Sequence, residues 1–211
     1  MAETSPPTSR ARRKDARPGE IRAAALALFA ARGFAATRLD DIARAAGIGK
    51  GTIYLYYPTK EDLFRAVVRQ DLLPDLDALE AEAAAHQGPA AMMLRRLLAA
   101  MVARIDADIA VVPKLILTEA GNFPALARFY AEEVAARGQR LVGAVLERGV
   151  ARGEFRPIDV PAVVPVVIAP MLLLMLWRRS LGPYMPTPLD PAAVMAAALD
   201  LLLRGLAPEV A

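Results

Sequence analysis

The side chains best suited to binding chemistry lie in residues 37–64, where basic, hydroxyl and aromatic residues recur at helical spacing. This spacing predicts two short helices joined by a tight turn, the second spanning about residues 50–56. The outward positions of the second helix are Lys50, Thr52, Tyr54 and Leu55. A charged group, a hydroxyl and an aromatic ring on one exposed face suit phosphates and base edges, so we expect this face to contact DNA. The alternative is an ordinary pair of helices with a solvated face.

The elements that must position this face carry signals of their own. We expect Thr37 to cap the first helix, with Asp40 as the acidic partner of a capping box. Gly47 should adopt the left-handed conformation that ends this helix, and the next residue should close it with a hydrophobic contact. Thr59 should cap the helix that follows, with Asp62 three residues further on. The apolar or small residues expected to hold the two helices together are Ile42, Ala43, Ala46, Ile48, Ile53 and Tyr56.

These residues resemble the DNA-binding domain of the TetR family of transcriptional regulators. That domain ends in a pattern like A-G-V-S-K-G-T-L-Y-x-Y-F-x-S-K-E-x-L, and residues 46–63 here read AGIGKGTIYLYYPTKEDL. The resemblance extends back to Ile21 and departs at Gly49, where the family often has Ser. Glycine is an acceptable cap, but it brings no hydroxyl for a phosphate. The predicted DNA-binding residues are Arg38, Lys50, Gly51, Thr52, Tyr54, Leu55, Tyr56 and Lys60.

Lys60 lies in the first turn of the helix that Thr59 begins. A cation at that position opposes the helix dipole, so a structural reason for this lysine is weak. We therefore expect its ammonium group to bind a DNA phosphate, and the resemblance implies the same role.

Charge is distributed unevenly along the 211 residues, whose formal net charge is +3. Residues 1–60 carry eleven Lys and Arg against five Asp and Glu, whereas residues 61–211 carry fifteen against eighteen. A basic head on a mildly acidic body is typical of a nucleic-acid module attached to a second domain. The chain has no Cys and a single His, which excludes disulfides and thiolate metal sites. Since no apolar run is present at the N-terminus, we expect a cytoplasmic protein.

The sequence predicts an all-α protein with two domains. An N-terminal three-helix helix-turn-helix DNA-binding domain, residues 18–64, is joined to a C-terminal helical ligand-binding and dimerisation domain, residues 65–211. Residues 1–17 are polar and basic and bury too little apolar surface to fold, so we expect a disordered arm. This arm either lies along DNA or is simply solvated.

Glycine and proline residues mark the expected helix ends. A support helix should span residues 18–32 and end at Gly33, with Phe34 folding back onto Phe29. The helix that Thr59 begins should run to about Leu73, where Pro74 kinks or breaks it. The later helices are expected at about residues 75–86, 89–107, 113–120, 123–152, 161–181 and 190–204.

The segment Val160–Trp177 contains eighteen residues without a charge, which is long enough to span a membrane. It also contains three prolines and is followed by two arginines, and an apolar helix of this kind equally suits a core or a subunit interface. The segment from Ala192 to Leu203 is similarly apolar. We expect these two helices to pair with a second copy, as the last two long helices do in the resembling family. A homodimer is also expected because one helix-turn-helix reads too few bases for useful specificity.

A small-molecule site is expected in the C-terminal domain, lined by methionine and aromatic side chains with a few polar groups. Each apolar member would serve equally well as ordinary core. The ligand that fits such a lining is hydrophobic or amphipathic. The candidate ligand-binding residues are Met101, Thr118, Glu119, Asn122, Phe123, Phe129, Met171, Met175 and Trp177.

The sequence shows no catalytic constellation, no metal-ligand set and no phosphate-binding glycine loop, so we expect neither an enzyme nor a cofactor. The hypothesis it supports is a DNA-binding transcriptional regulator, a repressor that binds a palindromic operator as a dimer and is released by a small molecule. Repression itself is implied by the resemblance alone. The alternatives are a membrane-associated DNA-binding protein and an enzyme built on a helical bundle.

Overall fold

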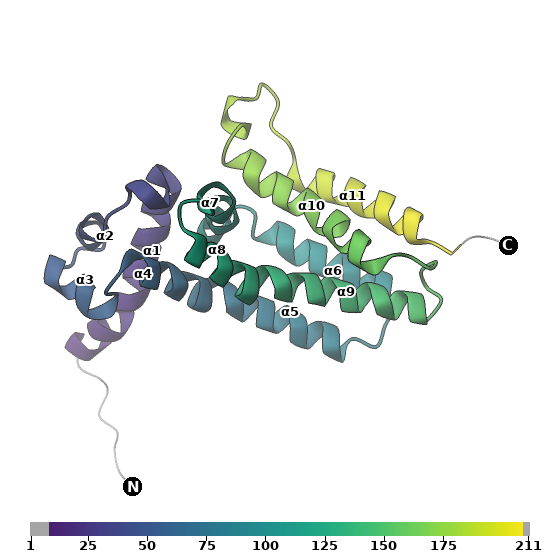
Figure 1. The fold of residues 1–211 in the computed structure, drawn as a ribbon, viewed down its shortest axis with the longest axis horizontal. Helices are drawn as coiled ribbons and strands as arrows, with labels where there is room; N and C mark the ends of the chain where they lie inside the picture. Colours follow the sequence, from purple (N-terminus) through teal and green to yellow (C-terminus); the bar gives the residue numbers. More distant parts are fainter. Residues whose placement is uncertain (1–8, 209–211) are drawn as a thin grey trace, which may run out of the picture. The chain divides into compact units, whose positions relative to one another are not determined.

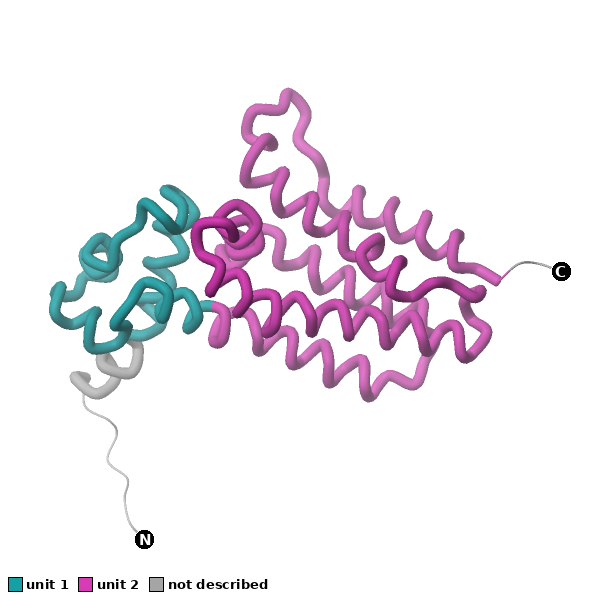
Figure 2. Tube along the Cα trace, in the orientation of Figure 1, with its two compact units in different colours: residues 1–67 teal, residues 68–211 magenta. Residues whose placement is uncertain are grey.

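A computed structural model describes residues 9–208 of the chain, and all regular elements in that range are helices (Figure 1). The helices divide into two compact units, residues 1–67 and residues 68–211 (Figure 2). The first unit contains the helix-turn-helix and the second is a bundle of helices, so the predicted all-α fold is confirmed. Residues 1–8 of the predicted arm lie outside the described residues.

The helices of the N-terminal unit surround an aromatic centre. They are α1 (Ser9–Ala36), α2 (Leu39–Ala45), α3 (Lys50–Tyr56) and α4 (Lys60–Val67). The rings of Phe29, Phe34 and Phe64 contact one another, with centroids 5.2 to 6.3 Å apart. Ile42 from α2 and Ile53 from α3 are also buried. Each such side chain contributes about 1.5–3 kcal/mol when buried, so this small core is enough to hold two seven-residue helices in place.

Helix α1 differs from the prediction at its start and agrees with it near its end. Residues 9–17, expected to be disordered, are helical and continue α1 upstream of Pro18. Arginine, lysine and alanine favour helical backbone, and the folded part of α1 provides the nucleus from which the helix extends. Gly33 interrupts α1 with a φ of 79°, at the predicted residue, and Phe34 packs on Phe29 as expected.

The turn between α2 and α3 is built on Gly47, whose φ of 65° lies in the left-handed region. The N–H of Gly47 donates to the carbonyl oxygen of Arg44 at 3.2 Å, and the N–H of Ile48 donates to that of Ala43 at 2.9 Å. These are the two hydrogen bonds of a Schellman motif. The predicted end of the first helix of the pair is therefore confirmed.

Thr37, in contrast, does not cap α2. The N-cap position belongs to Arg38, which makes no side-chain capping hydrogen bond. The Thr37 hydroxyl instead donates to the carbonyl oxygen of Gly33 at 2.7 Å, and the side chain is buried. Because the last carbonyl groups of a helix have no partner inside it, the hydroxyl satisfies a buried acceptor of α1 rather than a donor of α2.

The start of α4 has the predicted cap. The N–H of Asp62 donates to Oγ1 of Thr59 at 3.1 Å, and the Thr59 hydroxyl donates to Oδ2 of Asp62 at 2.6 Å. The hydrogen bond from Thr59 and the nearby Arg65 hold the pKa of Asp62 below its ordinary value. The two groups thus fix the first turn of α4.

The helices of the C-terminal unit follow one another with short connections. In chain order they are η1 (Val68–Leu72), α5 (Leu73–Ala85), α6 (Ala90–Ala103), η2 (Asp108–Ala110), α7 (Val111–Glu119), α8 (Pro124–Tyr130), η3 (Ala131–Ala135), α9 (Ala136–Ala151), α10 (Val160–Arg178), η4 (Gly182–Tyr184) and α11 (Pro191–Leu206). Asp159 and Asp190 cap α10 and α11, each accepting a backbone N–H.

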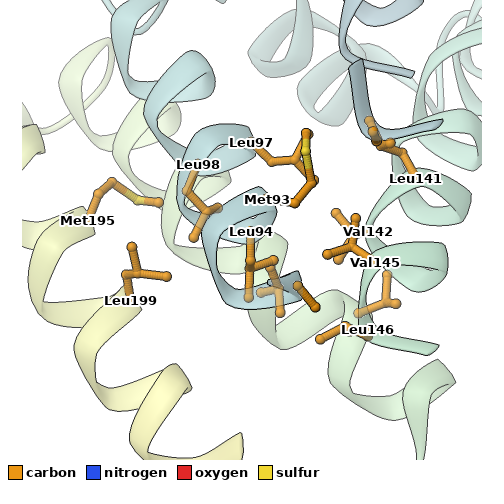
Figure 3. Packing of buried hydrophobic residues seen from close by; sticks show 14 of the residues in the cluster. Met93, Leu94, Leu97, Leu98, Leu141, Val142, Val145, Leu146, Met195 and Leu199 are labelled. Atoms are coloured by element: carbon orange, nitrogen blue, oxygen red, sulfur yellow. The ribbon is translucent and has the colours of Figure 1, made fainter. Parts of the chain in front are cut away.

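The core of this unit lies on the faces of α6, α9 and α11. Figure 3 shows side chains of α6 between those of α9 and those of α11. Gly149 of α9 allows one close approach, because a Cβ there would lie 2.1 Å from Cδ2 of Phe155. The labelled core residues are Met93, Leu94, Leu97, Leu98, Leu141, Val142, Val145, Leu146, Met195 and Leu199.

Two π-helical turns, η1 and η3, occur where longer α-helices were predicted. Pro74 does not break the chain, because it lies in the first turn of α5, where no intrahelical N–H donor is needed. The expected helix over residues 123–152 is likewise divided into α8, η3 and α9. A π turn holds one additional residue per turn, which the spacing of apolar residues does not reveal.

Among the described helices, α10 is long and apolar enough to cross a membrane by length and composition. It packs against α7, α9 and α11 within the C-terminal unit. Val167, Leu174 and Met175 are buried there, whereas Val166 and Leu173 are more than half exposed. The helix therefore has one face in the core of the unit and a second apolar face outside it.

Candidate nucleic-acid interface and ligand site

The exposed face of α3 carries the residues that the sequence placed outward. Leu55 is 84% exposed and Tyr54 is 44% exposed, whereas Ile53, on the opposite face of α3, is fully buried. Lys50 and Gly51 are also exposed, and Thr52 and Tyr56 are half-buried. A helix this short keeps its orientation only because Ile53 and the following Tyr57 anchor its opposite face. The remaining predicted DNA-binding residues are Arg38, which is exposed before α2, and Lys60, which is half-buried in α4.

Asp40 in α2 organises this face, a role that sequence reasoning missed. Its Oδ2 lies 2.8 Å from Nζ of Lys50, and its Oδ1 accepts a hydrogen bond from the Tyr54 hydroxyl at 3.3 Å. The hydrogen bond from Lys50 lowers the pKa of Asp40, and the carboxylate in turn raises the pKa of Lys50. The only signal in the sequence was an acidic residue in a basic segment, which we assigned to a capping box.

Lys60 has a structural role, although its position in the first turn of α4 is unfavourable for a cation. Its ammonium donates to the carbonyl oxygens of Phe34 at 2.5 Å, Ala35 at 3.2 Å and Thr37 at 2.9 Å. It also lies 4.4 Å from the centroid of the Phe34 ring. The carbonyl groups at the C-terminal end of α1 have a negative partial charge, so a cation from α4 stabilises them and ties the two helices together. A phosphate contact is therefore not needed to explain this residue.

The candidate ligand residues divide into core and surface. Met175 is buried in the core, and Met101 and Met171 are partly buried against it. Phe129 lies 5.2 Å from the guanidinium of Arg69, and Phe123 is half-buried. At the end of α7 the polar candidates are satisfied locally. The Thr118 hydroxyl donates to the carbonyl oxygen of Lys114, one turn earlier in the same helix, at 2.9 Å. The Asn122 amide donates to the carboxylate of Glu119 at 3.1 Å.

Two aromatic residues in the same unit carry polar groups away from bulk solvent. Burial raises the pKa of the phenol of Tyr130, at the end of α8, although its side chain is still partly exposed. The indole Nε1 of Trp177 in α10 is buried and has no hydrogen-bond partner among the described residues. A polar group in such a position is suited to orient a bound molecule. Trp177 was among the predicted ligand residues, and Tyr130 was not.

Basic residues gather where the end of α10 meets the start of α7. The ammonium of Lys114 donates to the carbonyl oxygen of Arg179 at 2.5 Å, and the Arg179 guanidinium donates to that of Ala107 at 2.7 Å. Arg178 is paired with Asp106. The backbone at Gly182 closes this end, since a Cβ there would lie 3.0 Å from the carbonyl oxygen of Trp177.

Comparison with known protein families accounts for both units. Residues 21–67 match the model of the family described as bacterial regulatory proteins, tetR family. Residues 85–194 match the model described as tetracyclin repressor-like, C-terminal domain. The two matches cover the helix-turn-helix and most of the second unit.

Two curated relatives are similar over most of their length. The chain is 34% identical over 154 residues to the HTH-type transcriptional repressor KstR2 of Rhodococcus jostii, covering 72% of this chain and 74% of that protein. It is 30% identical over 173 residues to KstR2 of Mycobacterium tuberculosis, covering 80% and 84%.

Solved structures have the same architecture. The ketosteroid transcriptional regulator KstR2 of Mycobacterium tuberculosis superposes with a TM-score of 0.72 at 28% identity, covering 92% of this chain and 96% of that one. The fatty acid degradation regulator FadR of Bacillus halodurans superposes with a TM-score of 0.73 at 20% identity, covering 89% and 98%. At that identity the second likeness shows a shared fold.

Proposed function

The chain belongs to the TetR family of bacterial regulatory proteins and is a DNA-binding transcriptional regulator, and from this premise we propose a more specific function. It acts in the cytoplasm as a repressor that binds a palindromic operator as a homodimer. A small hydrophobic or amphipathic effector releases it. The name of the KstR2 relatives, transcriptional repressors, supports the sign of the regulation.

The observation that carries this proposal is the exposed face of α3. It presents a lysine, a phenol and a leucine from a helix whose other side is anchored by fully buried Ile53. A helix of this kind fits the major groove, where an ammonium and a phenol reach phosphates or base edges and a leucine contacts a thymine methyl group. The recognition residues are Lys50, Gly51, Thr52, Tyr54, Leu55 and Tyr56, with Arg38 at the adjacent phosphates.

A homodimer is supported by the apolar surface of α10 and α11. Val166 and Leu173 of α10 and Leu201 of α11 are more than half exposed although each is apolar. These two helices contact each other and lie together at one side of the C-terminal unit (Figure 1). Pairing this surface with a second copy buries it and provides the two recognition helices that a palindrome requires. It also explains the apolar character of α10 without a membrane.

The effector is expected in the C-terminal unit, beside Met101, Met171 and Met175. Methionine side chains adapt to varied apolar ligands, and the unpartnered indole N–H of Trp177 and the partly buried phenol of Tyr130 could orient one. One similar protein of known structure is described as a ketosteroid transcriptional regulator, which supports a lipophilic class of ligand. Binding would favour a spacing between the two recognition helices that no longer matches successive major grooves.

The test is selection of bound sequences from a random DNA library with the purified full-length chain. We expect an inverted repeat whose half-sites are about 10 base pairs apart or more, centre to centre. The selection is then repeated in the presence of each member of a panel of steroids and fatty acids. A compound that abolishes recovery of the repeat is an effector. An asymmetric single site would contradict the dimer. Association of the chain with lipid vesicles instead of DNA would favour the membrane alternative.

A further inference from the structure

The end of α10 contains more hydrogen-bond donors than it can satisfy. Nε1 of Trp177 and Nε of Arg179 are both buried, and neither has a hydrogen-bond partner among the described residues. A buried donor without a partner costs about 1–3 kcal/mol, more when the group is charged. Such groups are rare in folded proteins and are found where a ligand, ion or water completes the site.

The positive charge at this place is also uncompensated. In the part of the chain that the structure describes, no carboxylate lies within ion-pair distance of Lys114 or Arg179. Each of the two instead donates to a neutral backbone carbonyl, Lys114 to that of Arg179 and Arg179 to that of Ala107. The adjacent Arg178 differs, because it is exposed and paired with Asp106. Half-buried cations of this kind gain most from an anionic acceptor.

We propose that Lys114, Arg179 and the indole N–H of Trp177 form a subsite for the anionic group of an amphipathic effector, a carboxylate or a phosphate. The inference rests on the proposed function, because it assigns the polar end of the ligand whose apolar part lies beside Met171 and Met175. The ammonium and guanidinium exchange their carbonyl acceptors for the anion, and the indole N–H donates to it. The three side chains offer only donors, so they favour an accepting anion and exclude a cationic or purely donating head group.

The location within the fold supports this assignment. Met171 and Met175 lie one turn apart on α10, and Trp177 follows half a turn later near the end of the same helix. The turn at Gly182 packs on the Cδ1 edge of Trp177, which shields the subsite from solvent. A charge-assisted hydrogen bond is strengthened in such a sheltered place.

The experiment uses three probes with the same ten-carbon chain: decanoate, decyl phosphate and decan-1-ol. Binding to the full-length chain is measured by calorimetry and by the emission of Trp177, which is the one tryptophan in the sequence. We expect both anions to bind more tightly than the alcohol and to change the emission. Arg179→Gln and Lys114→Gln should each weaken anion binding by about 10- to 100-fold and leave alcohol binding unchanged. Arg178→Gln removes the same charge one residue away and should leave the preference for anions intact.

The subsite is overturned if the alcohol binds as tightly as the anions, if no anion binds, or if Arg178→Gln has the same effect as Arg179→Gln. Anion binding without a change in Trp177 emission also contradicts the placement. Operator affinity, measured separately, distinguishes this from failure of the proposed function. Anions that bind through Arg179 without releasing DNA support the subsite and contradict the effector mechanism. Release of DNA by a neutral lipid whose binding is unchanged in Arg179→Gln supports the mechanism and contradicts the subsite.

Discussion

The carboxylate of Asp40 in α2 lies 2.8 Å from the ammonium of Lys50 in the first turn of α3. The same carboxylate accepts a hydrogen bond from Tyr54, one turn further along α3. Two of the side chains proposed to contact DNA are therefore held by an acidic group of their own unit. Because a phosphate and a carboxylate compete for one ammonium, binding of a phosphate by Lys50 would break or share this ion pair.

Replacing Asp40 with Asn should strengthen DNA binding that does not depend on sequence. The variant removes a negative charge from the DNA-facing surface and frees Lys50, while an amide can still accept a hydrogen bond from Tyr54. One additional phosphate contact should steepen the dependence of log affinity on log salt by about 1. The measurement is affinity for random duplex DNA across a range of salt concentrations.

The control for this change is Asp41→Asn, next in sequence. Asp41 is paired with Arg44 at 3.1 Å and not with a residue of α3. The Asp41→Asn substitution changes the formal charge by the same amount without freeing Lys50. An equal steepening in both variants would show a general charge effect and remove the specific role of Asp40.

Lys60→Met should reduce the stability of the N-terminal unit even without DNA. The change keeps the apolar stem but leaves the carbonyl oxygens of Phe34, Ala35 and Thr37 without their cation. Hydrogen bonds to a charged group contribute about 1.5–3 kcal/mol, so a loss in this range is expected. Urea unfolding followed by circular dichroism measures it. Unchanged stability together with weaker DNA binding would instead restore the phosphate role predicted from the sequence.

The sequence predicted those features of the N-terminal unit that depend on a single residue type. Gly33 and Gly47 are where the chain needs positive φ, and only glycine adopts such values readily. Thr59 and Asp62 form their cap within one turn, so their spacing along the chain was sufficient evidence.

Competing hydrogen-bond acceptors were not predictable from the spacing patterns. Thr37 and an acidic residue three positions later have the spacing of a capping box, but the carbonyl oxygen of Gly33 competes for the same hydroxyl. Lys60 appears unfavourable in its own helix, and its partners lie more than twenty residues earlier in the chain. For Thr37 the competing acceptor is only four residues earlier in the chain, whereas for Lys60 it is a tertiary one.

The candidate ligand site stays a prediction. Met175 lies in the core of the C-terminal unit and Met101 packs against it, which suits ordinary core as well as the wall of a ligand site. Nothing in the spacing indicated that Trp177 would have an unsatisfied N–H or that Lys114 would approach the end of α10. Such facts arise where α7 and α10 pack together, and a pattern along one segment carries no information about them.

Leu201→Glu should convert the proposed dimer into a monomer that still folds. Leu201 is 71% exposed on α11, so a carboxylate is solvated in the isolated chain but would be buried against a second copy. Leu199→Glu is the contrasting variant, because Leu199 is 9% exposed in the core and its replacement should unfold the unit. Sedimentation velocity and circular dichroism distinguish the two. A dimeric, folded Leu201→Glu variant would place the interface on another surface.

Leu55→Ala should weaken operator binding without affecting stability. Since Leu55 is 84% exposed, shortening it should change the free energy of unfolding by less than about 0.5 kcal/mol. Loss of one base contact should cost about 1–3 kcal/mol of operator affinity and reduce the preference for operator over random DNA. Leu117→Ala removes an exposed leucine from the other unit and serves as the control. Equal affinities of the wild type and Leu55→Ala would exclude a contact at this residue.

The cap at the start of α4 should make stability depend on pH in a defined direction. The hydrogen bond from Thr59 and the charge of Arg65 lower the pKa of Asp62 in the folded chain. A carboxylate with a depressed pKa contributes stability that is present above its unfolded pKa and is lost as the pH falls through the folded pKa. Thr59→Ala should therefore destabilise the N-terminal unit by about 1 kcal/mol at neutral pH, and this difference should shrink under acidic conditions.

The measurement for this cap combines urea unfolding of the wild type and Thr59→Ala at pH 7 and in acid with an NMR titration of Asp62. In the variant the pKa of Asp62 should move up toward its ordinary value. Glu61→Gln removes the neighbouring carboxylate of the same turn and should leave the Asp62 titration nearly unchanged. A difference between wild type and Thr59→Ala that stays constant as Asp62 is protonated would mean that the hydroxyl stabilises α4 through its backbone hydrogen bond alone. The carboxylate would then have no share in the cap.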